Sequence, residues 1–268
     1  VHTGAGAVTL APRLRWRDVA VADGLAARTG VPLERITVDN DANLATVAEL
    51  AELAELAELA AWSGPGEPAV ADLIYLTGDF GIGSGVISGG RLLRGSAGFA
   101  GEIGHLTMDP HGHHCSCGRR GCWETQVGLA ALLRLCADEH DPVRDPTLGL
   151  EERMRVVRAN AELGDQRTLA ALQQIGDALG TGVSVMVNLL NPAVVVLGGY
   201  FAALPEWLVE PVRQQVVANV LAPGAGGVKI VGSRLGFTAA AAGAAQAALR
   251  RVLDDPTVVP VLEQGAPA

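Results

Sequence analysis

The sequence predicts an α/β fold, because apolar strands and amphipathic helices alternate along the chain and glycine-rich turns separate them. The chain has 268 residues, of which 49% are hydrophobic and 34 are glycine. A chain of this length and composition can bury a large core, so we expect either two lobes or one large α/β unit.

The N-terminal part of the chain predicts a helix and then a strand. Residues 16–28, WRDVAVADGLAAR, have the apolar spacing of a short amphipathic helix, which Gly30 would close ahead of Pro32. Residues 36–43, ITVDNDAN, indicate a strand that runs into a helix. The junction between these two elements is a candidate place for a ligand.

The next helix contains the repeat AELAELAELAELA at residues 48–60. A period of three does not match the 3.6 residues of a helical turn, so the leucine stripe winds around the helix. We interpret the repeat as a tandem expansion that lengthens the helix. Its four carboxylates are expected to face water, on Glu49, Glu52, Glu55 and Glu58.

The middle of the chain predicts a β-hairpin after a linker, SGPGEP, at residues 63–68. The run DLIYLT at residues 72–77 indicates a buried strand, GDFGIGSG indicates a glycine turn, and VISGGRLLRG indicates a second strand and turn. These three segments together have the form of a hairpin.

The last third predicts further alternation. Residues 165–192 have the pattern of a long helix that ends at Asn191 and Pro192, and AVVVLGG follows as a buried strand with a glycine turn. Residues 206–221 predict another helix, and the alanine-rich stretch TAAAAGAAQAALRRVL predicts a packed terminal helix.

Charge and composition exclude some classes of function. The net charge is −9 and the isoelectric point is near 5.1, whereas binding of nucleic-acid phosphates needs clustered lysine and arginine. No apolar run reaches the roughly 20 residues of a membrane span. We therefore expect no nucleic-acid contact through these residues, no membrane association and, with reduced cysteines and no targeting segment, a cytoplasmic location.

The start of the chain is unusual. It begins with Val1 and not methionine, and it opens with the glycine-rich VHTGAGAV. We expect a truncated form of a longer protein, so that motifs missing here need not be missing from the parent.

The most informative stretch is EIGHLTMDPHGHHCSCGRRGCWE. Cys115, Cys117 and Cys122 lie within eight residues, and His105 lies ten residues before the first of them. Three glycines in the stretch give the backbone the freedom to wrap these ligands around a small ion. Three thiolates and one imidazole form a closed tetrahedral shell for Zn²⁺, so the spacing predicts a structural zinc loop and not a catalytic metal.

Two alternatives stand beside this interpretation. The cysteines could form a disulfide with one stray thiol, although Cys115 and Cys117 are too close for an easy bridge. The fourth ligand could also be another residue in or after the loop, namely His111, His113, His114 or Cys136. For Cys136, which lies in an apolar helical run, we expect an inert buried thiol.

Two glycine-rich turns follow apolar strands, at residues 78–85 and at Gly198 and Gly199. Such turns let backbone amides approach a phosphate or a sugar closely, but many serve only as tight connections. Each is therefore a candidate binding turn that needs support from other residues.

Polar side chains gather around the predicted zinc loop and the start of the long helix. Asn40 and Asp41 stand at the strand–helix junction, Glu102 and His105 open the cysteine stretch, and Glu124 closes it. Such a set suits a sugar, because each carboxylate can accept hydrogen bonds from two hydroxyl groups. The alternatives are an N-cap for Asp41 and an exposed helix start for Glu124.

The combination of VDNDAN, GIGSGVISGGRLLRGSAGFAGEIGH and CSCGRRGCWE resembles the ROK family of bacterial sugar kinases and sugar-responsive transcriptional repressors. PRLRWRDV, NPAVVVLGG and the terminal helix extend the resemblance over nearly the whole chain. It implies an actin-like, hexokinase-like fold of two α/β lobes with sugar in the cleft between them. Residues 1–40 would be the remnant of a small N-terminal lobe without its first strands. Residues 236–268 would return to that lobe, and residues 41–235 would form the large lobe, with the zinc loop at 105–122.

The resemblance also implies roles for single residues. Asn40, Asp41, Glu102, His105 and Glu124 would contact sugar hydroxyls. Asp41 would be the general base if the protein is a kinase that uses ATP and Mg²⁺. His105 would lie beside the sugar and also bind zinc, which couples the metal loop to the sugar site.

The phosphate turn departs from the kinase pattern. Where the kinases resemble Gly-Thr-Gly-Ile-Gly, this chain places Asp79 and Phe80 before Gly81, and the turn continues to Gly83 and Gly85. A carboxylate repels a polyphosphate and a phenyl ring adds bulk without a donor, so both changes disfavour ATP.

Two further departures concern the nucleotide. Tyr200 stands where the kinases carry a small residue near the adenosine, and the Asp-x-Gly-x-Thr phosphate turn of the family is not found in the sequence. We therefore expect the sugar-binding effector and oligomerisation region of a ROK-type transcriptional regulator, a dimer or tetramer that would contact DNA through a missing N-terminal domain. The alternative is an ATP-dependent sugar kinase. A third possibility is a degenerate fold with neither activity.

Overall fold

The computed structural model describes residues 1, 3–61, 70–221 and 227–258, and the predicted linker at residues 63–68 lies outside them. The described chain alternates strands and helices, as predicted. In order, the elements are β1 (Val8–Ala11), β2 (Trp16–Val19), α1 (Val21–Thr29), α2 (Asp41–Ala61), β3 (Leu73–Gly78), β4 (Ile82–Ser88), β5 (Arg91–Leu92), α3 (Glu124–Val127), α4 (Leu129–Cys136), α5 (Leu150–Glu162), α6 (Gln166–Leu190), β6 (Val194–Gly199), α7 (Tyr200–Ala203), α8 (Pro205–Asn219), β7 (Lys229–Gly232) and α9 (Ala239–Asp254).

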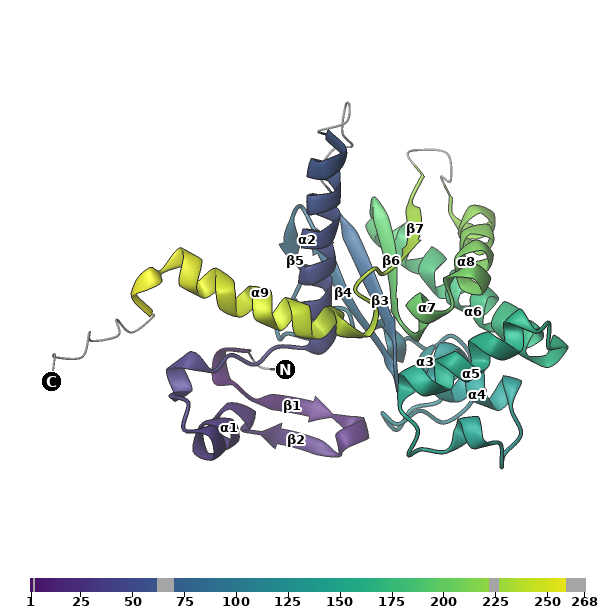
Figure 1. Ribbon diagram of the computed structural model, residues 1–268, viewed down its shortest axis with the longest axis horizontal. Helices are drawn as coiled ribbons and strands as arrows, with labels where there is room; N and C mark the ends of the chain where they lie inside the picture. The colour runs from purple at the N-terminus through teal and green to yellow at the C-terminus, as the bar shows by residue number, and fades with distance from the viewer. Residues whose placement is uncertain (2, 62–69, 222–226, 259–268) are drawn as a thin grey trace, which may run out of the picture.

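A five-stranded mixed sheet forms the centre of the molecule, with strands in the order β5-β4-β3-β6-β7 (Figure 1). β3 pairs with β4 antiparallel, which confirms the predicted hairpin, and with β6 in parallel. β7 extends the parallel half of the sheet beside β6. Gly78 faces Gly199 at the last register position of β3 and β6, so both strands end at the same edge. Ligand sites are common at such an edge.

Side chains of β3 alternate between the two faces of this sheet. Leu73 and Tyr75 join a smaller core under α2 and α9, whereas Ile74 and Leu76 join a larger core with α4, α6 and α8. Figure 1 shows α2 and α9 on one side of the sheet and α6 and α8 on the other. Burial on both faces explains why β3 and β6 are continuous apolar runs.

Helix α6 begins and ends where the sequence predicts. The side chain of Asp165 accepts a hydrogen bond from the N–H of Thr168 at 2.8 Å and caps the start. Asn191 ends the helix in the left-handed region with φ 45°, and its N–H donates to the carbonyl of Val187 at 2.9 Å. The predicted strand AVVVLGG and the two later helices are confirmed as β6, α8 and α9.

The prediction of one helix over residues 16–28 is wrong in its first third. Trp16–Val19 forms strand β2, which pairs antiparallel with β1, and α1 starts only at Val21. The turn of this hairpin is a 3-10 helix at Pro12–Leu14. Backbone hydrogen bonds to β1 outweigh the short helical pattern of these residues. Gly30 ends α1 as predicted, with φ 72°.

The strand predicted just before α2 does not form. Ile36 is extended, with φ −98° and ψ 123°, but the segment at 36–39 pairs with no strand among the described residues. Arg94 holds the segment instead, because its two terminal nitrogens lie 2.8 and 2.6 Å from the two carboxylate oxygens of Asp39.

The predicted long helix is confirmed as α2, but its glutamates do not all face water. Glu49 is only 2% exposed, it accepts a hydrogen bond from the hydroxyl of Ser233, and burial raises its pKa. Glu52 pairs with Arg234 at 3.6 Å. Glu55 is exposed as expected. The segment between β7 and α9 covers the first half of α2. The three-residue repeat of α2 does not indicate this contact, because the covering segment is distant in the sequence.

The N-terminal residues form a second, two-stranded sheet that lies apart from the main sheet (Figure 1). Helix α9 reaches this region, since Arg251 donates to the hydroxyl of Thr37 at 2.9 Å and to the carbonyl of Glu34 at 3.0 Å. The division into lobes after residues 40 and 235 remains a prediction. No described helix is both long and apolar enough to cross a lipid bilayer.

Candidate functional site

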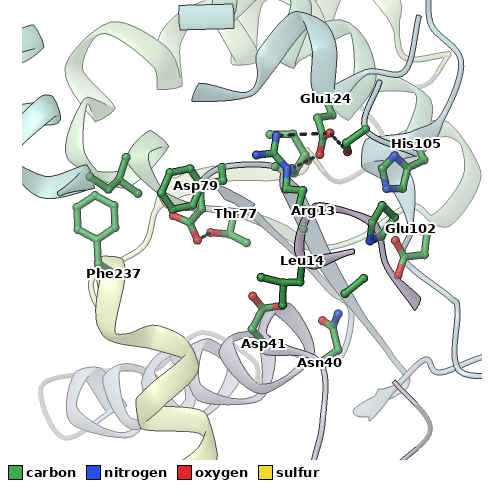
Figure 2. Close-up of a pocket in the computed structure, with 18 of the residues that line it drawn as sticks. Arg13, Leu14, Asn40, Asp41, Thr77, Asp79, Glu102, His105, Glu124 and Phe237 are labelled. Atoms are coloured by element: carbon green, nitrogen blue, oxygen red, sulfur yellow. Dashed lines mark hydrogen bonds and ion pairs between the residues drawn. The ribbon is translucent and has the colours of Figure 1, made fainter. Parts of the chain in front are cut away.

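A cavity of about 1110 Å³ opens at the edge where β3 and β6 end (Figure 2). Its walls come from the tip of the β1–β2 hairpin, the start of α2, the turn between β3 and β4, the 3-10 helix Ile103–His105 and the first turns of α3 and α5. We call this space the main cavity. Its size and mixed polar and apolar walls suit a small-molecule ligand.

The main cavity collects all five side chains that the sequence assigned to a sugar. They are Asn40, Asp41, Glu102, His105 and Glu124. In Figure 2, Asn40 and Asp41 come from the start of α2, while Glu102, His105 and Glu124 lie on the other walls. The fold thus brings together residues that are up to 84 positions apart in the chain.

Asn40, and not Asp41, caps helix α2. The Oδ1 of Asn40 accepts a hydrogen bond from the N–H of Asn43 at 3.1 Å. Asp41 is exposed, and its Oδ1 accepts from the adjacent N–H of Ala42 at 2.9 Å. Burial alone would raise the pKa of Asp39, but hydrogen bonds and charge from Arg94 outweigh it and hold the pKa below its ordinary value. The segment before α2 is therefore anchored while the carboxylate of Asp41 stays available to a ligand.

Glu124 is firmly held at the junction of the main cavity and the cysteine loop. It is 8% exposed, its Oε2 accepts the N–H of Ile82 at 3.2 Å, and its Oε1 accepts the hydroxyl of Ser116 at 3.4 Å. Arg13 lies 3.7 Å from the same Oε1 (Figure 2). Glu124 does begin α3, as the alternative interpretation expected, but it is buried and not an exposed helix start.

The turn between β3 and β4 carries an acid and an aromatic ring into the main cavity. Asp79 accepts a hydrogen bond from the hydroxyl of Thr77 at 3.4 Å. Burial first, and then the charge of Asp41, raises the pKa of Asp79. The ring of Phe80 is 57% exposed although it lines the cavity. This corner therefore repels further negative charge when Asp79 is ionised.

The glycine turn is shorter than the sequence predicted. Of the three glycines assigned to it, only Gly81 lies in the turn, whereas Gly83 and Gly85 lie inside β4. A Cβ on Gly83 would come within 3.1 Å of Ala42, and one on Gly85 would collide with the side chain of Thr46. The two strand glycines let α2 pack closely on β4, which positions the start of α2 at the cavity.

The four predicted zinc ligands lie together. His105, Cys115, Cys117 and Cys122 each offer one donor atom within 4.8 Å of the other three. The Nδ1 of His105 lies 3.6 Å from the Sγ of Cys115, and the sulfurs of Cys117 and Cys122 are 3.6 Å apart. Tetrahedral zinc with bonds of about 2.3 Å places two sulfurs about 3.8 Å apart, so the spacing fits this ion.

The chemistry of the donor set also suits a cation. Burial first, then hydrogen bonds with the thiols of Cys117 and Cys115, and last the charge of these groups raise the pKa of Cys122 to about 12. A cation would offset this cost, because it stabilises thiolates that lie close together. All four cysteines are free, which leaves the disulfide alternative without support. The other histidines of the loop are not part of this cluster in the described structure. Cys136 lies outside it, half-buried, and burial raises its pKa to about 11.

Several cavity residues were missed by sequence reasoning. Arg13 and Leu14 reach the main cavity from the hairpin tip, and Phe237 reaches it from the segment before α9 (Figure 2). Only tertiary packing brings them there, so no local pattern could have indicated them. Tyr200, which was expected near a nucleotide, is instead fully buried, and its hydroxyl donates to the carbonyl of Val127 at 2.5 Å.

A comparison of the sequence with known protein families identifies the family of this chain. The sequence profile of the ROK family matches residues 1–251. The chain belongs to the ROK family. The match covers nearly all of the chain, as the resemblance of the motifs implied.

Both kinases and repressors are found among the ROK relatives of this chain. A glucokinase from Halalkalibacterium halodurans is 30% identical over 250 residues, which cover 91% of this chain and 71% of that protein. A xylose repressor from Bacillus subtilis is 29% identical over 247 residues, which cover 92% of this chain and 58% of that protein. The chain therefore spans less than two thirds of the repressor's length.

Solved ROK structures confirm the actin-like, hexokinase-like fold. A ROK family glucokinase from Streptomyces griseus, in complex with glucose and AMPPNP, has a TM-score of 0.73 at 25% identity and covers 92% of this chain and 77% of that one. A ROK family transcriptional regulator, a homologue of the E. coli MLC protein, has a TM-score of 0.69 at 27% identity and covers 95% of this chain and 63% of that one.

Proposed function

We propose that this ROK chain is the sugar-binding effector and oligomerisation region of a transcriptional regulator, stabilised by a zinc loop. The sugar would lie in the main cavity, where Asn40 and the carboxylates of Asp41, Glu102 and Glu124 would hydrogen-bond its hydroxyl groups. His105 would contact the sugar while its Nδ1 binds zinc. When bound, the metal would fix the loop and the orientation of this imidazole.

The observation that favours a regulator over a kinase is the turn at Asp79–Gly81. The carboxylate of Asp79 lies at the end of β3, close enough to Asp41 for the charge of Asp41 to raise its pKa. Two neighbouring acids and the ring of Phe80 make this corner a poor place for the phosphates of ATP.

The names of the relatives support a monosaccharide as the ligand class. The Streptomyces griseus glucokinase structure contains glucose, and the Bacillus subtilis relative is a xylose repressor. In the proposed regulator, a sugar that closes the cavity would change how paired subunits present their DNA-binding elements, which would lie outside these residues. The protein would act in the cytoplasm as a dimer or tetramer.

One observation favours a sugar kinase as a second candidate. Asp41 is exposed at the main cavity, and Asn40 takes the capping role that would otherwise engage it. A free carboxylate beside bound sugar is what a general base needs, and a glucokinase is 30% identical to this chain. In a kinase, Asp41 would accept the proton of the sugar hydroxyl that attacks the γ-phosphate of ATP, with Mg²⁺ bound to the nucleotide.

Calorimetry separates the two candidates. The zinc-loaded protein is titrated with neutral hexoses, pentoses and N-acetylated hexosamines, and separately with ATP and Mg²⁺. The regulator predicts heat with at least one sugar and none with ATP. Sugar-dependent ATP turnover by the full-length protein would overturn the regulator, and binding of neither ligand would contradict both candidates.

A further inference from the structure

A second, smaller pocket lies against the main cavity. It has a volume of about 200 Å³, and three arginines line it: Arg13, Arg144 and Arg153. Phe80 and two leucines of α4 form its apolar walls. Because Arg13 and Phe80 line the main cavity as well, the two spaces share a wall. We call this space the arginine pocket.

Arg153 of α5 is the strongest sign that the arginine pocket holds a ligand. The residue is only 5% exposed, and its Nε has no hydrogen-bond partner among the described residues. Its Nη2 donates to the backbone carbonyl of Asp145. A buried guanidinium without a full set of acceptors is costly, because its charge has left water without compensation. An acceptor supplied by a ligand would remove this cost.

The acids near the arginine pocket are engaged elsewhere. The carboxylate of Asp145 accepts the N–H and the hydroxyl of Thr147 at 2.8 and 2.7 Å. The carboxylate of Asp138 pairs with Arg167 at 2.6 Å. Neither acid lines the pocket, and neither do Asp41 and Asp79.

Among the described residues, Arg13 is the one wall residue within ion-pair distance of a carboxylate. Arg144 and Arg153 act on Asp138 and Asp145 only through the longer-range effect of their charge. The ion pair of Arg13 with Glu124 is long, at 3.7 Å, and the Arg13 side chain is 43% exposed, so this contact is weak. The arginine pocket therefore presents three guanidinium groups and no carboxylate among its described lining residues.

We propose that the arginine pocket is an anion subsite, which binds the phosphoryl or carboxylate group of a sugar whose ring occupies the main cavity. The inference rests on the proposed function and names its ligand class as a sugar phosphate or a sugar acid. Guanidinium groups bind both kinds of anion through paired N–H donors. One ligand can contact both spaces, because Arg13 belongs to both.

The test compares each neutral sugar with its anionic forms. Calorimetry on the zinc-loaded chain uses glucose, glucose 6-phosphate and glucuronate at low salt, and the two anionic forms distinguish a phosphoryl from a carboxylate ligand. We expect one anionic sugar to bind at least about tenfold more tightly than glucose. We expect the preference to shrink in high salt, because screening weakens the ion pairs.

Two variants assign this preference to the arginine pocket. Arg144 is half-buried in the wall of the pocket, and Arg144→Gln should lower the preference for the anionic sugar at least about fivefold. Arg250→Gln removes an exposed charge on α9, which lies on the other side of the main sheet from α4 (Figure 1), and should leave the preference unchanged. Glucose binding as tightly as both anionic forms, or a preference that survives in Arg144→Gln, would overturn the subsite.

A second measurement keeps this test separate from the proposed function. Inorganic phosphate is titrated with the protein, and its ³¹P resonance is followed. If the wild type broadens the phosphate resonance and Arg144→Gln does not, the subsite is supported. This holds even when no sugar binds, and in that case only the proposed sugar-sensing function fails. Equal broadening by both proteins, or none by either, contradicts the subsite.

Discussion

The imidazole of His105 is shared by two sites: its Nδ1 lies 3.6 Å from the sulfur of Cys115, and the same ring lines the main cavity. A metal bound through Nδ1 leaves the other ring nitrogen for a ligand and fixes the plane of the ring. Loss of the metal should therefore disturb the cavity, although the three cysteines do not line it.

Replacing Cys117 with serine tests this coupling. Cys117→Ser removes one of the four donors, so we expect zinc content to fall well below one ion per chain and sugar affinity to fall about 10-fold to 100-fold. Elemental analysis and calorimetry measure the two effects. Cys136→Ser, which lies outside the cluster, is the control and should change neither. Unchanged sugar affinity after complete metal loss would disprove the coupling.

Asp41→Asn distinguishes a sensor from a kinase. The amide still hydrogen-bonds a sugar hydroxyl, so in a sensor the sugar affinity should fall less than about tenfold. In a kinase the same change removes the general base, and turnover should fall by about 100-fold or more. Calorimetry and a coupled ATPase assay on the full-length protein measure these outcomes.

A variant of the neighbouring residue gives the comparison for Asp41. Asn40→Ala should weaken sugar binding and also destabilise α2 by about 1 kcal/mol, because it removes the cap on the N–H of Asn43. Thermal unfolding detects this loss. An Asp41→Asn protein that is equally destabilised would contradict the assignment of the cap to Asn40.

Asp79 should make the stability of the protein depend on pH. Burial and the charge of Asp41 raise its pKa in the folded protein. The folded state therefore holds the proton more tightly than the unfolded state, and stability decreases as the pH rises from the ordinary aspartate range through the raised value. Asp79→Asn should be more stable than the wild type at pH 7 by less than about 1 kcal/mol after solvent screening, and this difference should vanish near pH 3.

Urea unfolding at pH 3, 5 and 7 measures this trend. Asp138→Asn is a control of opposite sign, because a hydrogen bond from Arg167 lowers the pKa of Asp138. Removing that carboxylate should reduce stability at neutral pH and have no effect once the group is protonated. If the free energy of unfolding depends on pH in the same way for the wild type and for Asp79→Asn, folding does not raise the pKa of Asp79 and this prediction is wrong.

Gly85→Ala tests whether this glycine serves helix packing. The new methyl group would collide with Thr46 of α2, so we expect a loss of about 1–3 kcal/mol in the free energy of unfolding. Gly24→Ala, in α1, meets no neighbouring atom and should be neutral or slightly stabilising. Chemical denaturation compares the two. A stable Gly85→Ala protein would mean that α2 can shift away from β4 without cost.

The sequence predicted the elements that carry strong local signals. Helix α6 has an aspartate cap and a terminal asparagine, and β3 and β6 are mainly apolar runs that end in glycine, so these limits could be inferred without a structure. β1, β2 and β7 are each four residues long, and their pairing depends on distant segments. Such short strands have no period long enough to detect.

The candidate site shows the same division between residues that a local motif reveals and residues that only packing brings into place. Asn40, Glu102 and Glu124 were predicted because they flank recognisable motifs, and the structure brings them into one cavity. Arg13 and Arg153 lie in ordinary hairpin and helix sequence. Their importance depends on which acids lie nearby and which nitrogen lacks a partner, and these are properties of the packed molecule only.

The crossing of α2 and α9 has a mechanical consequence. Gly243 lies against the carbonyl of Leu44, where any side chain would collide, so the backbones of the two helices touch. From Gly243 to Asp254, α9 extends about 16 Å at 1.5 Å per residue. A tilt of about 10° at this contact would move the C-terminal end of α9 by about 3 Å. The hydrogen bonds of Arg251 to Thr37 and Glu34 would carry that motion to the segment that leads into Asp41, so α9 acts as a lever arm between the two.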